Sequence, residues 1–505
     1  MKTKFCAVLI TLFLLCICQI GYGQSNVVPA SNFNFSGGYL NTGQANGATN
    51  NIDAAPTLPG WYGMRVWDLA GCSWYTLEPS AGTYNWTCLD VATATLHAAG
   101  ITETMYTLGN TPPALTGNQG VQYSAWSCYP PLLSGNTSSY DATTTANFIT
   151  AMLNRYSSAS PGVGAGHARI TGIEDWNEPY GSGFWCSTAA ILNTHMQNVW
   201  NTVQAWNSAN NTVAPVKVNS PVLYTSATPT DCTPSTGSDS GTFTVYQFLK
   251  TYGTSYFDNI SYHFYPYPEN TEPPEQGLGG KLSAVYCQLN ASGASYSGKP
   301  LWNTESAPNG GSGAIPDQAY DLAAYVSREL LWLWGTPSTY LSGYRVARNY
   351  WYMYDCCTWT GNSILCARGT NCTTVGALTG AGKAWYYTAQ WMTGNTLTSC
   401  TLSNGFYTCP ITESNGKNAL ALWANQWESA GTPTYSFSSG AYATFRDLCG
   451  NTTSLGSSST CNGVTQSSTS TSVNVGDQPV LLETASSAPP PSAPAPPQGL
   501  TATVQ

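Results

Sequence analysis

The chain has 505 residues, a formal net charge of −9 and an isoelectric point near 4.8. It contains no run of Lys and Arg, so its charge argues against nucleic acid as a partner. Aromatic residues are plentiful, with 18 Trp and 32 Tyr, and aromatic side chains offer flat faces that suit carbohydrates. The four His residues are scattered, and no H-E-x-x-H or Cys-x-x-Cys motif is present, so we expect neither a metal nor a cofactor.

The N-terminus has the pattern of a secretory signal peptide. Lys2 and Lys4 precede an apolar run over residues 5–20, and small residues follow up to Gly23. This pattern predicts a signal peptide over residues 1–23. The run is short for a membrane span and no later run is long enough, so we expect an exported protein, extracellular or periplasmic, without a membrane span.

Cysteine usage agrees with export. Three of the 17 Cys lie in the predicted signal peptide, which leaves an even number for an oxidising compartment. Disulfides are therefore expected. Two pairs are close enough in sequence to form local loops, namely Cys400 with Cys409 and Cys449 with Cys461.

From residue 62 to residue 394, strand-like and helix-like segments alternate. Strands are predicted at residues 64–68, 101–108, 170–176, 216–220, 260–265, 300–304 and 346–354. Helices are predicted at 89–99, 144–156, 189–206, 243–252, 317–334 and 383–392. This alternation indicates a parallel α/β architecture. A (β/α)8 barrel and a doubly wound sheet both fit, but the G-x-G-x-x-G and Walker-type loops that favour the second are missing.

Beyond residue 394 the helical pattern gives way to strands and turns. Strands are expected within residues 396–409, 419–423, 434–437, 443–448 and 472–482, which predicts a small β-sandwich domain over residues 395–485. A Pro-rich tail fills residues 486–505. The whole chain thus divides into a signal peptide (1–23), a large α/β domain (24–394), the sandwich and the tail.

Two Glu residues lie in strand-like stretches of a chain with only 8% charged residues. Glu178 belongs to Trp-Asn-Glu-Pro at residues 176–179, and Glu305 ends Trp-Asn-Thr-Glu at residues 302–305. A carboxylate at the end of a buried strand is costly unless it is paired or used. Two such groups among Trp and Asn indicate the pair of acids that cleaves a glycosidic bond. Asn177 is placed to hold a sugar hydroxyl, and His263 or Tyr265 to keep Glu305 anionic.

A set of motifs in chain order resembles clan A glycoside hydrolases, closest to family 39 and related secreted glycosidases. The motifs lie at residues 65–68, 74–79, 106–112, 176–179, 260–265, 300–305, 350–352 and 382–386. The resemblance implies a (β/α)8 barrel, followed here by the β-sandwich, and reaction with retention of configuration. It differs at residues 24–60, which are polar where family members show an apolar first strand.

The resemblance also implies roles for individual residues. Glu178, after the fourth strand, takes the position of the acid/base, and Glu305, at the end of the seventh, that of the nucleophile. Residues that orient the nucleophile or grip the substrate are Arg65, Trp67, Asn177, His263 and Tyr265, and Trp351 takes the place of the aromatic platform after strand eight.

The expected function is that of a secreted retaining O-glycoside hydrolase acting on a β-linked polysaccharide or oligosaccharide. The expected partner is therefore a carbohydrate substrate. Two alternatives remain: a non-catalytic carbohydrate-binding protein on a degenerate barrel, and a transglycosylase with the same residues. The two intact Glu residues argue against the first alternative.

Overall fold

The computed structural model describes residues 26–36, 61–67, 69, 71–122, 126–133, 139–180, 183–225, 244–265, 273–293, 299–308, 320–335, 345–352, 378–426 and 431–485. The predicted signal peptide and the Pro-rich tail lie outside these ranges. In the described part, no helix has both the length and the apolar character needed to cross a membrane.

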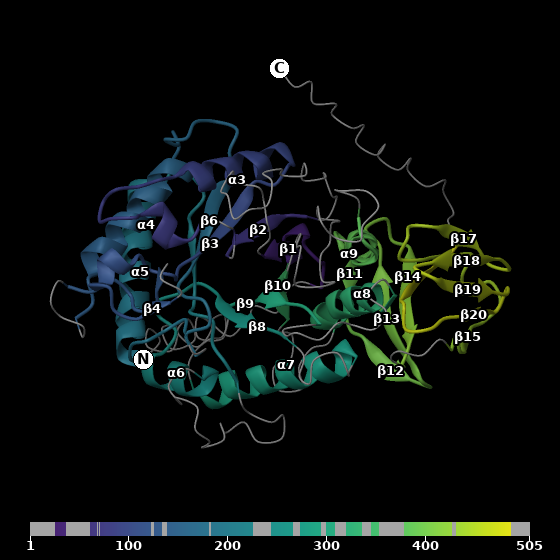
Figure 1. The fold of residues 1–505 in the computed structure, drawn as a ribbon. Coiled ribbons are helices and arrows are strands. Elements are labelled where there is room, and N and C mark those ends of the chain that lie inside the picture. The colour runs from purple at the N-terminus through teal and green to yellow at the C-terminus, as the bar shows by residue number, and fades with distance from the viewer. Residues whose placement is uncertain are drawn as a thin grey trace, which may run out of the picture.

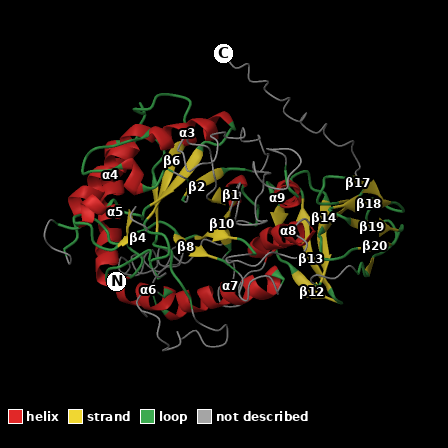
Figure 2. Cartoon of the chain, in the orientation of Figure 1, coloured by secondary structure: helices red, strands yellow, loops and turns green. Residues whose placement is uncertain are grey.

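Eight parallel strands form the centre of the large domain, and Figures 1 and 2 show the strands of this sheet inside the layer of helices. Their order in the sheet is β7-β6-β3-β2-β1-β10-β9-β8. Backbone bridges between Asn219 and Asn259 and between Leu223 and Tyr262 join the two end strands β7 and β8, so the sheet closes into a barrel. In chain order the strands are β1 (Phe33–Ser36), β2 (Gly63–Val66), β3 (Glu103–Thr107), β6 (Arg169–Glu174), β7 (Lys217–Asn219), β8 (Ile260–His263), β9 (Leu301–Ser306) and β10 (Val346–Tyr352).

Helices surround this barrel (Figure 2). They are α2 (Trp74–Leu77), α3 (Thr87–Ala98), α4 (Ala142–Tyr156), α5 (Ala189–Ala209), α6 (Val245–Tyr252), α7 (Pro274–Ala291), α8 (Tyr320–Gly335) and α9 (Gly380–Met392), with 3-10 turns η1 (Ala30–Asn32) and η2 (Pro113–Thr116). In α4, the Asp141 side chain caps the helix by accepting from two backbone N–H groups. The apolar side chains that α4 buries against the barrel recur with helical spacing: Phe148, Ile149, Met152, Leu153 and Tyr156.

The predicted barrel is confirmed, and the structure adds elements that the sequence pattern did not reveal, among them one strand and one long helix of the barrel. Strand β1 lies in the polar segment 24–60, where Phe33 and Phe35 are buried. Between these two residues, the Asn34 amide donates to backbone oxygens of Ser31 and Asn349, so a polar residue serves a buried strand. Helix α7 was also missed, because its buried positions alternate with Gly and polar residues.

The C-terminal domain consists of two antiparallel sheets, as predicted. One has the order β11-β13-β14-β21-β16-β17, with β12 beside β13, and the other the order β15-β20-β19-β18. The strands are β11 (Thr396–Leu397), β12 (Thr401–Ser403), β13 (Phe406–Thr412), β14 (Asn418–Ala424), β15 (Thr434–Ser436), β16 (Thr444–Arg446), β17 (Thr452–Ser454), β18 (Ser458–Cys461), β19 (Val464–Ser468), β20 (Ser472–Asn474) and β21 (Val480–Glu483). The stretch predicted as one strand over 472–482 is two, separated by Gly476 and Asp477.

Polar contacts hold the sandwich against the barrel. Arg328 on α8 donates to the Glu275 carboxylate on α7 and to the backbone oxygen of Gln426. Arg345 donates to the backbone oxygen of Leu397, and Val27 pairs with Thr396. The sandwich is therefore fastened to α7, α8 and the N-terminal segment.

Four disulfides join described residues: Cys72–Cys88, Cys128–Cys186, Cys400–Cys409 and Cys449–Cys461. The last two were predicted from their spacing. Cys128–Cys186 ties the hairpin of β4 (Val121–Gln122) and β5 (Trp126–Ser127) to the segment that follows Glu178. Cys72–Cys88 and Cys128–Cys186 thus brace loops at the carboxyl ends of barrel strands, whereas the other two disulfides lie in the C-terminal domain.

Candidate active site

The two predicted carboxylates meet at the carboxyl end of the barrel. Glu178 follows the fourth barrel strand, β6, and Glu305 lies near the end of the seventh, β9. One oxygen of each carboxylate and one nitrogen of His263 all lie within 4.8 Å of one another. The Glu178 side chain is 23% exposed and that of Glu305 7%. Both acids therefore border one site, with Glu305 the deeper of the two.

Arg65 occupies the floor of this site and is fully buried. Its guanidinium lies 2.5 Å from Glu305 Oε1 and 2.5 Å from Glu174 Oε2, and it donates to Asn177 Oδ1 at 2.7 Å. Burial lowers the pKa of Arg65, but the charges of Glu174 and Glu305 outweigh burial and raise it overall. Arg65 is thus a permanent cation that fixes one oxygen of Glu305.

The second oxygen of Glu305 is held by residues at and just after the end of β8, the sixth strand of the barrel. Tyr265 donates its hydroxyl to Oε2 at 2.8 Å, and His263 Nδ1 lies 3.4 Å from the same atom. Burial and the charge of Glu305 raise the pKa of Tyr265 well above its usual value, so the phenol keeps its proton. Glu305 is held at both oxygens by Arg65 and Tyr265, as a nucleophile requires.

Glu178 has a strained backbone and two close partners. Its φ of 39° lies in the left-handed region, which is costly for a residue with a Cβ. Oε1 lies 2.7 Å from His263 Nδ1 and accepts from the Tyr180 hydroxyl at 3.2 Å. Burial raises the pKa of Glu178, but hydrogen bonding and charge from His263, with smaller effects from Tyr180 and Arg65, lower it overall.

Asn177 and Trp67 also reach this end of the barrel. Asn177 accepts from Arg65 through Oδ1, and its Nδ2 makes no hydrogen bond within the described ranges, which leaves that group able to donate to a ligand. The ring of Trp67 lies 5.9 Å from the Arg65 guanidinium. Gly109 lies against this ring, and a Cβ there would come within 3.0 Å of it.

Trp351 lies elsewhere. It is 1% exposed, and its ring packs near those of Tyr325 on α8 and Trp385 on α9. The side chain therefore points out of the barrel into the layer of helices, and the expectation that it stacks on a sugar does not fit this placement. Side chains alternate along a strand, so the neighbouring Tyr352 takes the inward direction, and its phenol affects the pKa of Tyr265.

Several partners of these residues were not predicted from the sequence. Glu174 is the second carboxylate that pairs with Arg65. Tyr180 lies only two residues after Glu178, and this closeness in sequence could have identified it as a partner. Ser36 on β1 accepts from Arg65, but it lies in the polar segment that showed no strand pattern.

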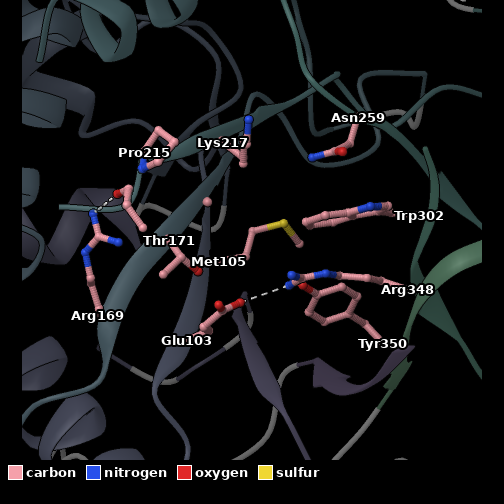
Figure 3. A pocket seen from close by; sticks show the side chains of 12 residues that line it. Glu103, Met105, Arg169, Thr171, Pro215, Lys217, Asn259, Trp302, Arg348 and Tyr350 are labelled. Atoms are coloured by element: carbon pink, nitrogen blue, oxygen red, sulfur yellow. Dashed lines mark hydrogen bonds and ion pairs between the residues drawn. The ribbon is translucent and has the colours of Figure 1, made fainter. Parts of the chain in front are cut away.

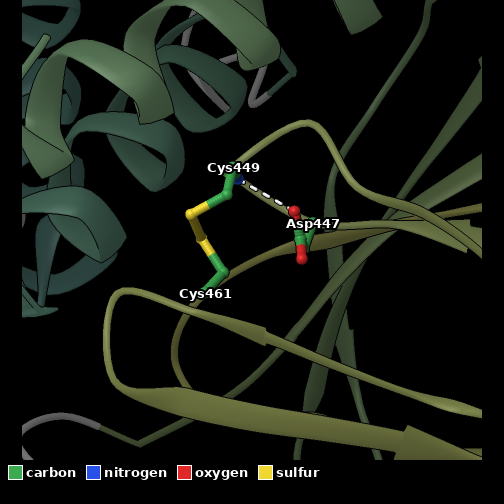
Figure 4. Close-up of side chains that lie close together, drawn as sticks. All are labelled: Asp447, Cys449 and Cys461. Carbon is green, nitrogen blue, oxygen red and sulfur yellow. Dashed lines mark hydrogen bonds between the residues drawn. A yellow bond between two sulfur atoms is a disulfide. The ribbon is translucent and has the colours of Figure 1, made fainter.

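In the part of the chain that the structure describes, two clusters have the donor groups and spacing of a metal site. In the first, Glu178, His263 and Glu305, the Arg65 cation already lies against Glu305, which opposes a second cation. In the second, shown in Figure 4, the sulfurs of Cys449 and Cys461 are bonded to each other. The Asp447 carboxylate there accepts from Ser459 and Asn451, so this cluster is a braced turn.

A cavity of about 350 Å³ opens at the opposite, amino end of the barrel (Figure 3). Its walls include three cations, which already have partners. Arg348 pairs with Glu103, Lys217 pairs with Asp258, and Arg169 donates to the backbone oxygens of Ser157 and Ala214. The amino end of such barrels contributes to stability, whereas chemistry takes place at the carboxyl end.

Comparisons with known proteins agree with this geometry. A family model described as beta-galactosidase, of glycoside hydrolase family 42, matches residues 58–118. This short match spans β2 to β3 and includes Arg65 and Trp67. A search of curated protein sequences finds no match.

Three solved structures are similar over nearly the whole chain. A family 39 glycoside hydrolase from Bacteroides cellulosilyticus has a TM-score of 0.56 at 15% identity, covering 91% of this chain and 82% of that one. A family 39 beta-xylosidase from Caulobacter crescentus has a TM-score of 0.55 at 16% identity, covering 92% and 97%. The catalytic domain of the family 30 xylanase C from Talaromyces cellulolyticus has a TM-score of 0.52 at 14% identity, covering 92% and 98%.

These similarities establish the fold and confirm the predicted resemblance to clan A glycoside hydrolases, including family 39. The beta-galactosidase match supports a glycosidase, the class of enzyme that the paired carboxylates predicted.

Proposed function

We propose that this protein is an exported retaining O-glycoside hydrolase that cleaves β-glycosidic bonds of a polysaccharide or oligosaccharide. Glu305 is the nucleophile and Glu178 the acid/base. Arg65 and Tyr265 hold the nucleophile, while Asn177, His263 and Trp67 line the sugar site. The four disulfides support export, because such bonds persist in oxidising compartments.

The spacing of the two carboxylates carries this proposal. Retaining glycosidases place their carboxyl groups roughly 5–5.5 Å apart, whereas inverting enzymes leave roughly 6.5–9.5 Å for a water molecule. One oxygen of Glu178 and one oxygen of Glu305 lie within 4.8 Å of each other. This distance favours direct attack by a carboxylate over attack by an intervening water.

The reaction proceeds in two displacements. Glu305 attacks the anomeric carbon while the bond to the leaving oxygen breaks and Glu178 gives that oxygen a proton. Glu178 then takes a proton from water, the resulting hydroxide attacks the anomeric carbon, and the bond to Glu305 breaks. Two inversions at one carbon give overall retention.

The lowered pKa of Glu178 bears on the first step, since an acid must hold a proton. His263 Nδ1 lies 2.7 Å from the Glu178 carboxylate, and this hydrogen bond stabilises the ionised form of Glu178. We infer that bound substrate weakens this hydrogen bond and excludes water, so that Glu178 holds its proton when the leaving oxygen draws on it.

Hydrolysis of a glycan panel tests the proposal. Glu178→Gln and Glu305→Gln should retain the fold and lose most turnover of whichever glycan the wild type cleaves. Glu103→Gln is a matched control, because Glu103 lies on a barrel strand at the opposite end and pairs with Arg348. NMR of the first product should show retained configuration, and azide should rescue Glu178→Ala by forming a glycosyl azide.

Other results would point elsewhere. Near wild-type activity in either Gln variant would refute the assigned roles, and an inverted product would refute the double displacement. Binding without release of reducing ends would indicate a carbohydrate-binding protein. Transfer products that dominate at high acceptor concentration would indicate a transglycosylase.

A further inference from the structure

Strand β9 is irregular at the residues around Glu305. Against β8, Tyr262 pairs with Asn303 but the next residue, His263, pairs with Glu305. Against β10, Asn349 pairs with Asn303 whereas Trp351 pairs with Ser306. On both edges β9 thus carries one extra residue between Asn303 and Ser306, which is a β-bulge. Bulges interrupt the hydrogen-bond ladder and redirect a side chain, here that of Glu305.

Side-chain hydrogen bonds replace the ladder at this bulge. Asn303 Nδ2 donates to the Ser306 hydroxyl at 2.8 Å, and Asn303 Oδ1 accepts from the backbone N–H of Phe264. The Ser306 hydroxyl donates to Glu329 Oε1 on α8, and Asn303 Nδ2 lies 3.4 Å from the same oxygen. The Glu329 carboxyl group therefore fastens both ends of the bulge to a helix outside the barrel.

Glu329 is 1% exposed, and its Oε2 is buried without a hydrogen-bond partner. Burial raises the pKa of Glu329 to about 8, although hydrogen bonds from Ser306 and Asn303 lower it. The charged groups of the surrounding elements are committed elsewhere: Arg328 on α8 pairs with Glu275 on α7, and Arg65 holds Glu305 within the barrel. Tyr325 on α8 is a protonated phenol. No cation among the described residues pairs with Glu329.

We propose that Glu329 is a positioning residue whose uncharged carboxyl group clamps the β9 bulge and thereby aims Glu305 at the anomeric carbon. This inference rests on the proposed function. Glu329 itself touches neither substrate nor reacting atoms, because it reaches β9 from the helical layer while Glu305 points into the barrel.

Loss of the Glu329 proton has a defined consequence. An anion behind β9 would have no counter-charge among the described residues. Such a buried charge is costly, and the bulge can relieve the cost by letting water reach Glu329. We therefore expect kcat to fall as the pH rises through about 8.

Two substitutions at Glu329 distinguish the effect of its hydrogen bonds from the effect of its ionisation. Glu329→Leu removes the hydrogen bonds to Ser306 and Asn303, and misplacement of the nucleophile should lower kcat by about 10- to 100-fold with KM little changed. Glu329→Gln keeps an oxygen that accepts from Ser306 and cannot ionise, so it should restore most of the activity and remove the alkaline decline. Ser327→Ala is the matched control, since Ser327 is a buried residue of α8 that bonds Thr388 on α9.

Ser306→Ala provides a second, independent test if Glu329→Leu does not fold. It breaks the clamp from the β9 side and should lower kcat in the same manner. Wild-type kcat in Ser306→Ala, or in folded Glu329→Leu, would overturn the proposal, as would an unchanged alkaline decline in Glu329→Gln. Glu305→Gln separates the two claims: if it is inactive while Glu329→Leu is fully active, only the clamp fails, and if it is active, both fail.

Discussion

Arg65 pairs with two buried carboxylates, so Arg65→Met tests the account strongly. The side chain is 0% exposed and lies 2.5 Å from both Glu174 and Glu305. Removing one partner of a buried ion pair costs about 3–5 kcal/mol, because the remaining charge is buried without compensation. Here two carboxylates lose their shared cation, so we expect the upper end of that range, about 5 kcal/mol.

Urea denaturation at pH 7 measures this loss as the change in the free energy of unfolding. Arg155→Met is the matched control, because the Arg155–Asp90 pair has the same 2.5 Å separation but both side chains are 29% exposed. An exposed pair is worth up to about 1 kcal/mol. The loss in Arg65→Met should also shrink at acidic pH, where protons neutralise the stranded carboxylates. A loss no larger than that of Arg155→Met would refute the buried network.

Three further predictions follow from individual contacts. Tyr265→Phe removes the 2.8 Å hydrogen bond to Glu305, and steady-state kinetics should show kcat lowered by about 10- to 100-fold; a normal kcat would mean that this bond does not orient the nucleophile. Trp351→Ala should lower the free energy of unfolding, measured in urea, by about 3–5 kcal/mol. A raised KM at unchanged stability would instead support Trp351 as an aromatic platform for the sugar. Glu329→Gln should stabilise the protein at pH 8. Folding raises the pKa of Glu329 from 4.5 to about 8. The stability that depends on this bound proton is therefore fully present below pH 4.5 and is lost as the pH rises to about 8. At about 1.36 kcal/mol per pKa unit, the free energy of unfolding of Glu329→Gln should exceed that of the wild type at pH 8 by up to about 5 kcal/mol. Equal stability of variant and wild type at pH 8 would contradict this.

The sequence predicted those parts of the fold that depend on local pattern. Alternating strands and helices indicated the barrel, and the resemblance to clan A glycoside hydrolases implied the positions of Glu178 after the fourth strand and of Glu305 at the end of the seventh. Strand β1 was not predictable in this way. Its polar residues Asn34 and Ser36 are buried only because they bond to Asn349 and Arg65, which are distant in sequence.

The site shows the same division between local and long-range information. Motifs identified Arg65 and Tyr265, but not the face of the strand on which Trp351 lies, because its ring contacts Tyr325 and Trp385 come from helices and cannot be deduced from the strand itself. The role of Glu329 could not be predicted from the sequence for a related reason. Its importance comes from Ser306 and Asn303 across the helix–strand interface, and a single Glu in an apolar helix carries no local sign of that contact.

The central claim is that Glu305 forms a covalent bond with the substrate. A mechanism-based inhibitor, such as a 2-deoxy-2-fluoro aryl glycoside of the sugar that the panel identifies, should accumulate as a glycosyl-enzyme. Mass spectrometry of the digested protein should then find one sugar on the peptide that contains Glu305, and no label in Glu305→Gln. A label on another carboxylate, or none while the substrate is hydrolysed with inversion, would contradict the account.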